Sequence, residues 1–202
     1  DKTLSYSLLE IPELLKKLCA ISGLQWIRLQ YCYPEEITVE LFDTIRTEEK
    51  ICHYLDIPIQ HASDAILKRM GRRTSNQEIR QLIAKLRREI PDIALRTTFI
   101  SGFPGETEED HQILKDFVKD MEFERAGVFN YSPEEDTPAD GCAEQIPEEV
   151  KGRRRAEIME LQQEIAFAHS SAMEGRVLEA FIEGKVADED AYVGRTYMDS
   201  PD

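Results

Sequence analysis

Three segments of the chain bring together residue types that can bind a small polar ligand. They are 58–64 (PIQHASD), 99–107 (FISGFPGET) and 130–138 (NYSPEEDTP). The first offers amide, imidazole and hydroxyl groups, which both donate and accept hydrogen bonds. The second contains two glycines, whose missing side chains let a ligand approach the backbone. Such residues suit a nucleotide-like ligand, with its flat base, polar ribose and charged end.

The second and third segments supply candidate contacts to the base. Gly102 and Gly105 leave room for a flat ring beside the backbone, and Ile100 offers one apolar face. Backbone groups near Tyr131 could hydrogen-bond the polar edge of the ring. An alternative interpretation stays open, in which the glycines serve only the turn geometry and the third segment is only a turn.

The remaining candidates are polar side chains. Gln60 and Ser63 could hydrogen-bond a ribose, and Arg72 could form a forked contact with a carboxylate. Structural explanations compete, because Gln60 and His61 can cap a helix and Arg72 can be an ordinary surface charge. Spacing alone therefore predicts a parallel α/β protein with a nucleotide-like site, and it assigns no catalytic residue.

These segments must be positioned by the elements that precede them. Strand-like runs occur four times, separated by helical patterns: 26–31, 53–59, 95–100 and 127–131. Strands and helices that alternate at spacings of about 30 residues are typical of parallel βαβ units, in which ligands bind beyond the carboxyl ends of the strands. Four units make half or more of a TIM-like barrel. The predicted fold class is α/β, as part of a TIM-like (βα) barrel.

Two regions follow these units. Pro147 begins a long helix that carries an apolar stripe: Ile158, Leu161, Ile165, Ala168 and Ala172. Beyond it the pattern changes to two antiparallel strands joined by an acidic turn. We therefore expect a partial barrel at 1–146 with the last four βα units, a connecting helix at 147–173 and the start of a small antiparallel β domain at 174–202.

The net charge of −15 is unevenly spread. Residues 101–150 hold fifteen acidic and three basic side chains, whereas 51–100 hold nine basic and five acidic ones. An acidic surface repels nucleic-acid phosphates and attracts basic partners, although it can also serve solubility alone. No apolar run approaches the roughly 18 residues of a membrane helix, and we find no signal-peptide pattern. We expect a cytoplasmic protein without a membrane partner.

The four cysteines are widely spaced. Cys19, Cys32, Cys52 and Cys142 lie 13, 20 and 90 residues apart. They form no C-x-x-C or C-x-x-x-C-x-x-C motif, so we predict no metal or cluster ligands in this sequence. We expect all four to be structural or incidental, since cysteines beside strands are usually small buried apolar residues.

The sequence around the candidate residues resembles the methylthiotransferase family of radical S-adenosylmethionine enzymes. The resemblance is carried by 55–63 (LDIPIQHAS), 67–72 (LKRMGR) and 95–107 (LRTTFISGFPGET), and it continues at 129–133 (FNYSP) and 193–197 (VGRTY). It covers essentially the whole chain in order. It implies a radical-SAM barrel followed by the start of a TRAM β domain.

The resemblance also implies a cofactor and a chemistry. S-adenosylmethionine is expected to contact the candidates named above: Gln60, Ser63, Arg72, Ile100, Gly102 and Tyr131. A radical generated from it would take hydrogen from the β-carbon of an aspartate, and a methylthio group would be inserted there. The family uses two 4Fe–4S clusters, but the cluster motif and the second-cluster domain are missing from this sequence. We therefore expect a fragment of a longer protein that ligates neither cluster and is itself inactive.

Within the family, Gln60-His61 and the segment 194–201 (GRTYMDSP) resemble the branch that modifies small-subunit ribosomal protein number twelve. His61 is then a candidate substrate contact, and the acidic surface suits a basic protein better than nucleic acid. The alternatives are a tRNA adenosine methylthiotransferase, a non-catalytic ribosomal-protein binding module and an unrelated phosphate-binding barrel. An open sheet edge also predicts self-association, for example as a dimer.

Overall fold

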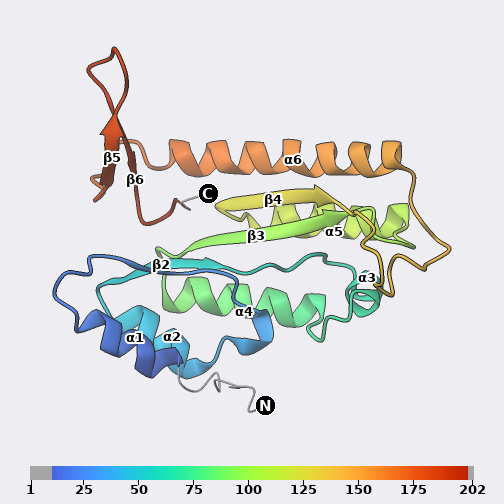
Figure 1. Cartoon of the computed structure of the whole chain (residues 1–202), viewed down its shortest axis with the longest axis horizontal. Coiled ribbons are helices and arrows are strands. Elements are labelled where there is room, and N and C mark those ends of the chain that lie inside the picture. The colour runs from blue at the N-terminus through green and yellow to red at the C-terminus, as the bar shows by residue number, and fades with distance from the viewer. Residues whose placement is uncertain (1–10, 200–202) are drawn as a thin grey trace.

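The computed structural model describes residues 11–199, so the outermost residues of the two expected terminal domains lie outside it. In Figure 1 the strands lie between the last helix at the top of the view and earlier helices at the bottom, and a hairpin lies beyond the last helix. The elements are α1 (Ile11–Cys19), β1 (Ile27–Leu29), η2 (Pro34–Glu36), α2 (Val39–Thr47), β2 (Ile51–Asp56), α3 (Asp64–Arg69), α4 (Asn76–Glu89), β3 (Ala94–Ser101), α5 (Glu108–Met121), β4 (Arg125–Asn130), α6 (Glu148–Ser171), β5 (Phe181–Lys185) and β6 (Tyr192–Arg195).

The central sheet is parallel and has the order β1-β2-β3-β4. Leu55 of β2 aligns with Leu95 of β3, and Phe99 of β3 aligns with Val128 of β4. Sequential order with helical crossovers is the arrangement of a (βα) barrel segment, so the α/β prediction is confirmed. Within the described residues β1 and β4 are the outer strands, and each leaves one edge unpaired.

One face of the sheet carries the main core. Along β3 the side chains alternate, so that Leu95, Thr97 and Phe99 are buried while Arg96 and Thr98 are half-buried. The buried face packs against apolar residues of α1, α2, α4, α5 and α6, as the period of two in a strand requires. The helices therefore cover the outer face, and the half-buried set lines the inner face.

The C-terminal segment covers part of that inner face. Tyr197 and Met198 pack against Cys52, Tyr54 and Ala94 at the amino-terminal ends of the strands. The guanidinium of Arg125 at the start of β4 lies 2.9 Å from an Asp199 carboxylate oxygen. The carboxyl-terminal ends of the strands are free of this segment, since α3 and the β4–α6 loop lie there (Figure 1).

Two helices begin with capping boxes. Ser75 accepts a hydrogen bond from the Glu78 amide at the start of α4, and Thr107 accepts one from the Asp110 amide at the start of α5. Ser63 occupies the cap position of α3 without a side-chain capping bond. Its hydroxyl instead donates to Asp110 Oδ1 at 2.5 Å, which ties α3 to α5.

The buried side of α6 is more polar than its sequence suggested. Of the expected apolar stripe, Ile158 alone is fully buried, and Ala168 and Ala172 are exposed. Its buried neighbours on that side are Lys151, Arg154 and Gln162, which follow the same helical spacing of three and four residues. Each of the three makes tertiary hydrogen bonds; Gln162 Nε2, for example, donates to the Phe123 carbonyl at 2.8 Å.

β5 and β6 form an antiparallel hairpin, as expected after α6. Its strands are exposed along almost their whole length. The Phe181 ring reaches Trp26, with the ring centroids 5.7 Å apart.

Among the helices described, none has the length and apolar character needed to cross a membrane.

Candidate functional site

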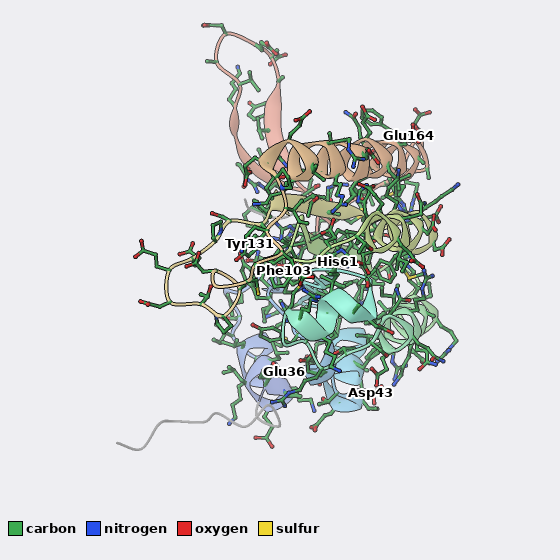
Figure 2. The ribbon with its side chains drawn as sticks, turned by 90° about the vertical axis from the view of Figure 1, so that its right-hand side faces the viewer. Glu36, Asp43, His61, Phe103, Tyr131 and Glu164 are labelled. Atoms are coloured by element: carbon green, nitrogen blue, oxygen red, sulfur yellow. The ribbon has the colours of Figure 1, made fainter. Side chains whose placement is uncertain are left out.

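The candidate residues gather where the parallel strands end. Figure 2 views the molecule from this side and shows His61, Phe103 and Tyr131 close to its centre, with the β4–α6 loop projecting beside them. The pairing of β2 with β3 is extended beyond β2 by a bridge between Gln60 and Phe99. The loops after β2, β3 and β4 are therefore brought to one edge, as predicted for a parallel sheet.

Gln60 has an unusual backbone conformation for a residue with a side chain. Its φ is +76°, in the left-handed region that costs a residue other than glycine about 1–3 kcal/mol. Two hydrogen bonds hold it there: its amide donates to the Thr98 carbonyl at 2.9 Å, and its carbonyl accepts from the Ile100 amide at 2.8 Å. The half-buried Gln60 side chain makes no hydrogen bond to another described residue, so its amide group is available to a ligand.

Arg72 and Ile100 are also accessible. The Arg72 guanidinium lies 5.0 Å from the centre of the Tyr33 ring, a cation–π contact that fixes its direction. Arg72 forms no ion pair within the described chain and keeps its charge available. Ile100 is half-buried at the end of β3, on the inner face of the sheet. The contacts expected of both residues remain predictions.

His61 and Ser63 lie in the interior. The His61 ring is fully buried, and its Nδ1 accepts a hydrogen bond from the Ser63 amide at 2.9 Å. The proton of a neutral ring therefore resides on Nε2, which lies 3.5 Å from Glu106 Oε2. Contact with a substrate does not fit this placement, because the ring faces protein groups. The Ser63 hydroxyl proton is also in use, because it is donated to Asp110 Oδ1.

The glycines leave space that protein side chains fill. Gly102 has φ +75° and Gly105 has φ +81°, so both turns require glycine. A Cβ on Gly102 would overlap the methylenes of Lys151, and one on Gly105 would overlap the Arg69 guanidinium. We expected an adenine to approach the backbone at Gly102. The Lys151 methylenes fill the space beside this residue instead, so packing and backbone conformation explain why it is a glycine.

Tyr131 closes this end of the sheet. Its backbone amide donates to the Ser101 carbonyl at 2.8 Å, and its carbonyl accepts from Lys151 Nζ at 3.0 Å. We expected backbone groups near Tyr131 to contact the edge of a base. The amide of Tyr131 itself is already bonded, and its carbonyl already accepts one hydrogen bond. Its ring packs on Phe103, with the centroids 5.2 Å apart. The ring forms one wall of an apolar cluster that Ile100 also joins.

The Glu106 carboxylate organises this edge, and it was not among the residues predicted from the sequence. It accepts from the Gly102 amide at 2.7 Å and lies 2.9 Å from Arg154 Nη1. Burial alone would raise the pKa of Glu106. The His61 ring, the Gly102 amide and Arg154 outweigh that effect and lower the pKa below its usual value. The carboxylate is therefore ionised at neutral pH.

A signal for this network was present in α6. Counting back from Ile158 by four and then by three places Arg154 and Lys151 on the side that faces the sheet. Two cations on a buried helix face need partners, and buried charges are almost always paired. The acidic partner could have been sought in the neighbouring loops.

Metal ligation is not supported by the described part of the chain. No group of three or more His, Cys, Asp or Glu side chains is arranged there to hold a metal ion. The four cysteines are free thiols; Cys52 is buried and the others are half-buried. The arrangement can bind and orient a polar ligand along the carboxyl edge.

Comparison with known proteins gives this geometry a context. A profile of the Radical SAM superfamily matches residues 5–118. The fold is similar to that of the radical SAM enzyme coproporphyrinogen III oxidase (HemN) from Escherichia coli. The TM-score is 0.58 and the identity 22%, over 82% of this chain and 37% of that chain. The fold prediction is thus supported by an independent structure.

Curated relatives extend along almost the whole chain. The ribosomal protein uS12 methylthiotransferase RimO of Lachnoclostridium phytofermentans is 65% identical over 95% of this chain and 43% of its own length. Enzymes of the same name from Acetivibrio thermocellus and Thermoanaerobacter sp. are 50% and 48% identical, each over 98% of this chain and 44% of its own length. The chain spans less than half the length of these relatives.

Proposed function

The chain belongs to the radical SAM superfamily, and from that premise we propose that it is part of a methylthiotransferase acting on ribosomal protein uS12. The reaction would insert a methylthio group at the β-carbon of one aspartate. The observation that carries the proposal is the 65% identity over 95% of the chain to an enzyme of that name. The motif-bearing loops are also gathered at one edge of a parallel sheet.

The carboxyl edge is the proposed site of S-adenosylmethionine. The fit rests on the unpaired Gln60 side chain beside a strained backbone, on the uncompensated charge of Arg72 and on the accessible apolar surface of Ile100. Gln60 would hydrogen-bond the ribose, Ile100 would pack on the adenine and Arg72 would bind the carboxylate. The site would be shaped by three residues behind these contacts: Ser63, Gly102 and Tyr131.

The chain's own residues bind and orient the cofactor in this proposal. When bound, S-adenosylmethionine supplies the radical chemistry that C–H activation needs. The two 4Fe–4S clusters of the proposed enzyme have no ligand set among the described residues. We accordingly propose that these residues contribute binding and that the chain alone is inactive.

The substrate proposal is supported by charge near the site. The β4–α6 loop, 132–146, carries five acidic side chains and no basic one. It is anchored beside the candidate site, because the Glu144 carbonyl accepts from the Gly105 amide at 2.8 Å. An acidic rim attracts a basic ribosomal protein and repels the phosphates of RNA. A ribosomal substrate would also place the enzyme in the cytoplasm.

Two further expectations remain proposals. The hairpin β5–β6 is proposed to be the start of a TRAM domain. The unpaired edges of the four-stranded sheet are proposed to allow self-association of this chain. Light scattering that shows a monomer over a wide concentration range would refute the second proposal.

The test uses the whole protein that carries this chain, reconstituted anaerobically with iron and sulfide. It would be offered ribosomal protein uS12 and unmodified transfer RNA in parallel, with mass spectrometry to detect an added methylthio group. We expect modification of the uS12 aspartate alone. Modification of RNA alone would assign the protein to the tRNA-modifying branch, and modification of neither would refute a methylthiotransferase.

A further inference from the structure

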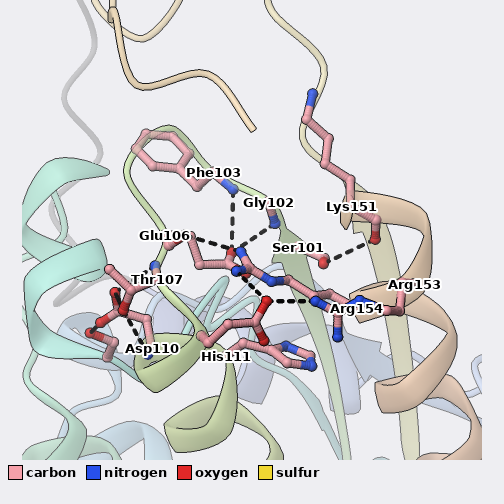
Figure 3. Close-up of polar contacts among 12 residues, drawn as sticks. Ser101, Gly102, Phe103, Glu106, Thr107, Asp110, His111, Lys151, Arg153 and Arg154 are labelled. Carbon is pink, nitrogen blue, oxygen red and sulfur yellow. Dashed lines mark hydrogen bonds and ion pairs between the residues drawn. The ribbon is translucent and has the colours of Figure 1, made fainter. Parts of the chain in front are cut away.

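The first turns of α6 are fastened to two of the three loops at the carboxyl edge. Lys151 and Arg154 stand one turn apart on α6 and are 2% and 4% exposed. Long cationic side chains are rarely buried this completely unless they are paired. Both point from the helix toward the loops that follow β3 and β4, where their partners lie (Figure 3).

Lys151 joins the ends of β3 and β4. Its Nζ donates to the Tyr131 carbonyl at 3.0 Å and lies 2.6 Å from Glu148 Oε1. Its backbone carbonyl accepts from the Ser101 hydroxyl at 3.4 Å. Its methylenes fill the space above Gly102 that a Cβ would occupy. The ammonium therefore fixes one loop, and the methylenes pack against the other.

Arg154 acts on the β3–α5 loop through Glu106. Its Nη1 contacts Glu106 Oε1 at 2.9 Å and also donates to the Glu106 backbone carbonyl at 3.0 Å. The other carboxylate oxygen, Oε2, accepts from the amides of Gly102 and Phe103 at 2.7 and 3.3 Å. Figure 3 shows this chain of contacts running from α6 to the loop. The loop backbone is therefore held by a carboxylate whose own direction is set by α6.

Packing alone does not explain such a network. Burying an ion pair removes both charges from water, and apolar residues of similar volume often stabilise a protein equally well. What the polar arrangement adds is direction, because hydrogen bonds to two successive amides specify one loop conformation. That loop begins beside Ile100 and ends at the cap of α5, so its conformation determines the shape of the proposed cofactor site.

We propose that Lys151 and Arg154 are positioning residues, which hold the loops after β3 and β4 in the geometry that receives S-adenosylmethionine. The inference rests on the proposed function for the identity of the ligand, but the mechanical link from α6 to the loops does not depend on it. Arg153 provides a matched control. It is the adjacent arginine and it is exposed. It shares Glu108 with Arg154, but its other partner is Glu157 and not Glu106.

The experiment compares Arg154→Met, Arg154→Lys and Arg153→Met in the whole protein purified without clusters. Hydrogen exchange of the peptide 99–107 is measured first, with no ligand present. Loss of a charge-assisted contact predicts exchange about tenfold faster in Arg154→Met, an intermediate value in Arg154→Lys and no change in Arg153→Met. Equal exchange in wild type and Arg154→Met would overturn the proposal. If Arg154→Met does not fold, Glu106→Gln keeps the shape of the carboxyl group and tests the same link.

Binding of S-adenosylhomocysteine by calorimetry is the second measurement. We expect about tenfold weaker binding for Arg154→Met with partial recovery in Arg154→Lys. Lys151→Met retains the methylenes above Gly102 and is expected to bind more tightly than Lys151→Ala. Unchanged binding in Arg154→Met would overturn the positioning role. If wild type binds no S-adenosylhomocysteine while exchange responds as expected, the proposed function fails and the mechanical link stands.

Discussion

The Arg28 guanidinium in β1 donates to the backbone carbonyl of Tyr197 at 3.2 Å, across 169 positions of sequence. The same nitrogen lies 3.3 Å from the Thr196 carbonyl. The Tyr197 hydroxyl in turn donates to the Asp92 carbonyl at 2.8 Å. The segment after β6 is thus bound to the amino-terminal side of the sheet, opposite the candidate cofactor site.

Replacing Arg28 by methionine should loosen this segment. The variant keeps an apolar stem and leaves two carbonyls without their donor, at a cost of about 1 kcal/mol, or roughly fivefold in local opening. Tryptic cleavage after Arg195, followed by mass spectrometry, should be faster by that factor. Arg46→Met is the control, because it removes an exposed pair with Asp43. Equal cleavage in the two variants would show that Arg28 does not anchor the segment.

Phe99 should be among the most sensitive core positions. It is fully buried, and its ring meets Phe117 and Phe123 at centroid distances of 6.3 and 6.0 Å. Phe99→Ala is expected to lower the free energy of unfolding by about 3–5 kcal/mol, because it leaves a cavity. Phe167→Ala, at a position 63% exposed, should change it by about 0.5 kcal/mol or less. Urea denaturation compares them, and similar losses would contradict the described core.

Much of the fold was predictable because local signals agreed with tertiary packing. The Ser75–Glu78 and Thr107–Asp110 boxes each need only neighbours three residues apart, and strand periodicity needs only a buried face. Ser63 shows where such local rules fail. It occupies the N-cap position of α3, but its hydroxyl donates to Asp110, which is distant in sequence, instead of capping the helix.

The candidate site was less predictable for the same reason. Gln60, Arg72 and Ile100 are accessible, and their contacts with a ligand remain proposals. The surroundings of Gly102 and His61 include Lys151 and Glu106, whose positions follow from tertiary structure. Spacing can indicate which residues share an edge, but it does not show which partners their atoms have already taken.

Stability in acid should reveal the ion-pair cluster around Glu157. Hydrogen bonds from Lys115 and His111 lower the pKa of Glu157 to about 2, from 4.5. Because the folded pKa is the lower one, this contribution is fully present above pH 4.5 and is lost as pH falls toward about 2. The difference in unfolding free energy between wild type and Glu157→Gln should therefore shrink from pH 6 to pH 3. The exposed Glu160→Gln is the control, and a difference independent of pH would contradict the pairing.

Cys32 should react slowly with alkylating reagents. Burial, and then Asp56 and Glu36, raise the pKa of its thiol from 9.0 to about 11. Since the thiolate is the reactive form, alkylation by iodoacetamide at pH 8 should be about a hundredfold slower in the native protein than in urea. Peptide mass spectrometry measures both rates. Equal rates would mean that the environment described around Cys32 is wrong.

The most direct test of the cofactor site is calorimetric titration of the whole protein with S-adenosylmethionine. Gln60→Ala and Arg72→Ala should each weaken binding about tenfold, since each removes a direct polar contact. Gln77→Ala and Arg73→Ala are matched controls, because these residues are exposed neighbours outside the proposed contacts. We expect weaker binding of S-adenosylmethionine in Gln60→Ala and Arg72→Ala, and wild-type affinity in the two controls. Wild-type affinity in all four variants would place the cofactor away from the carboxyl edge of this sheet.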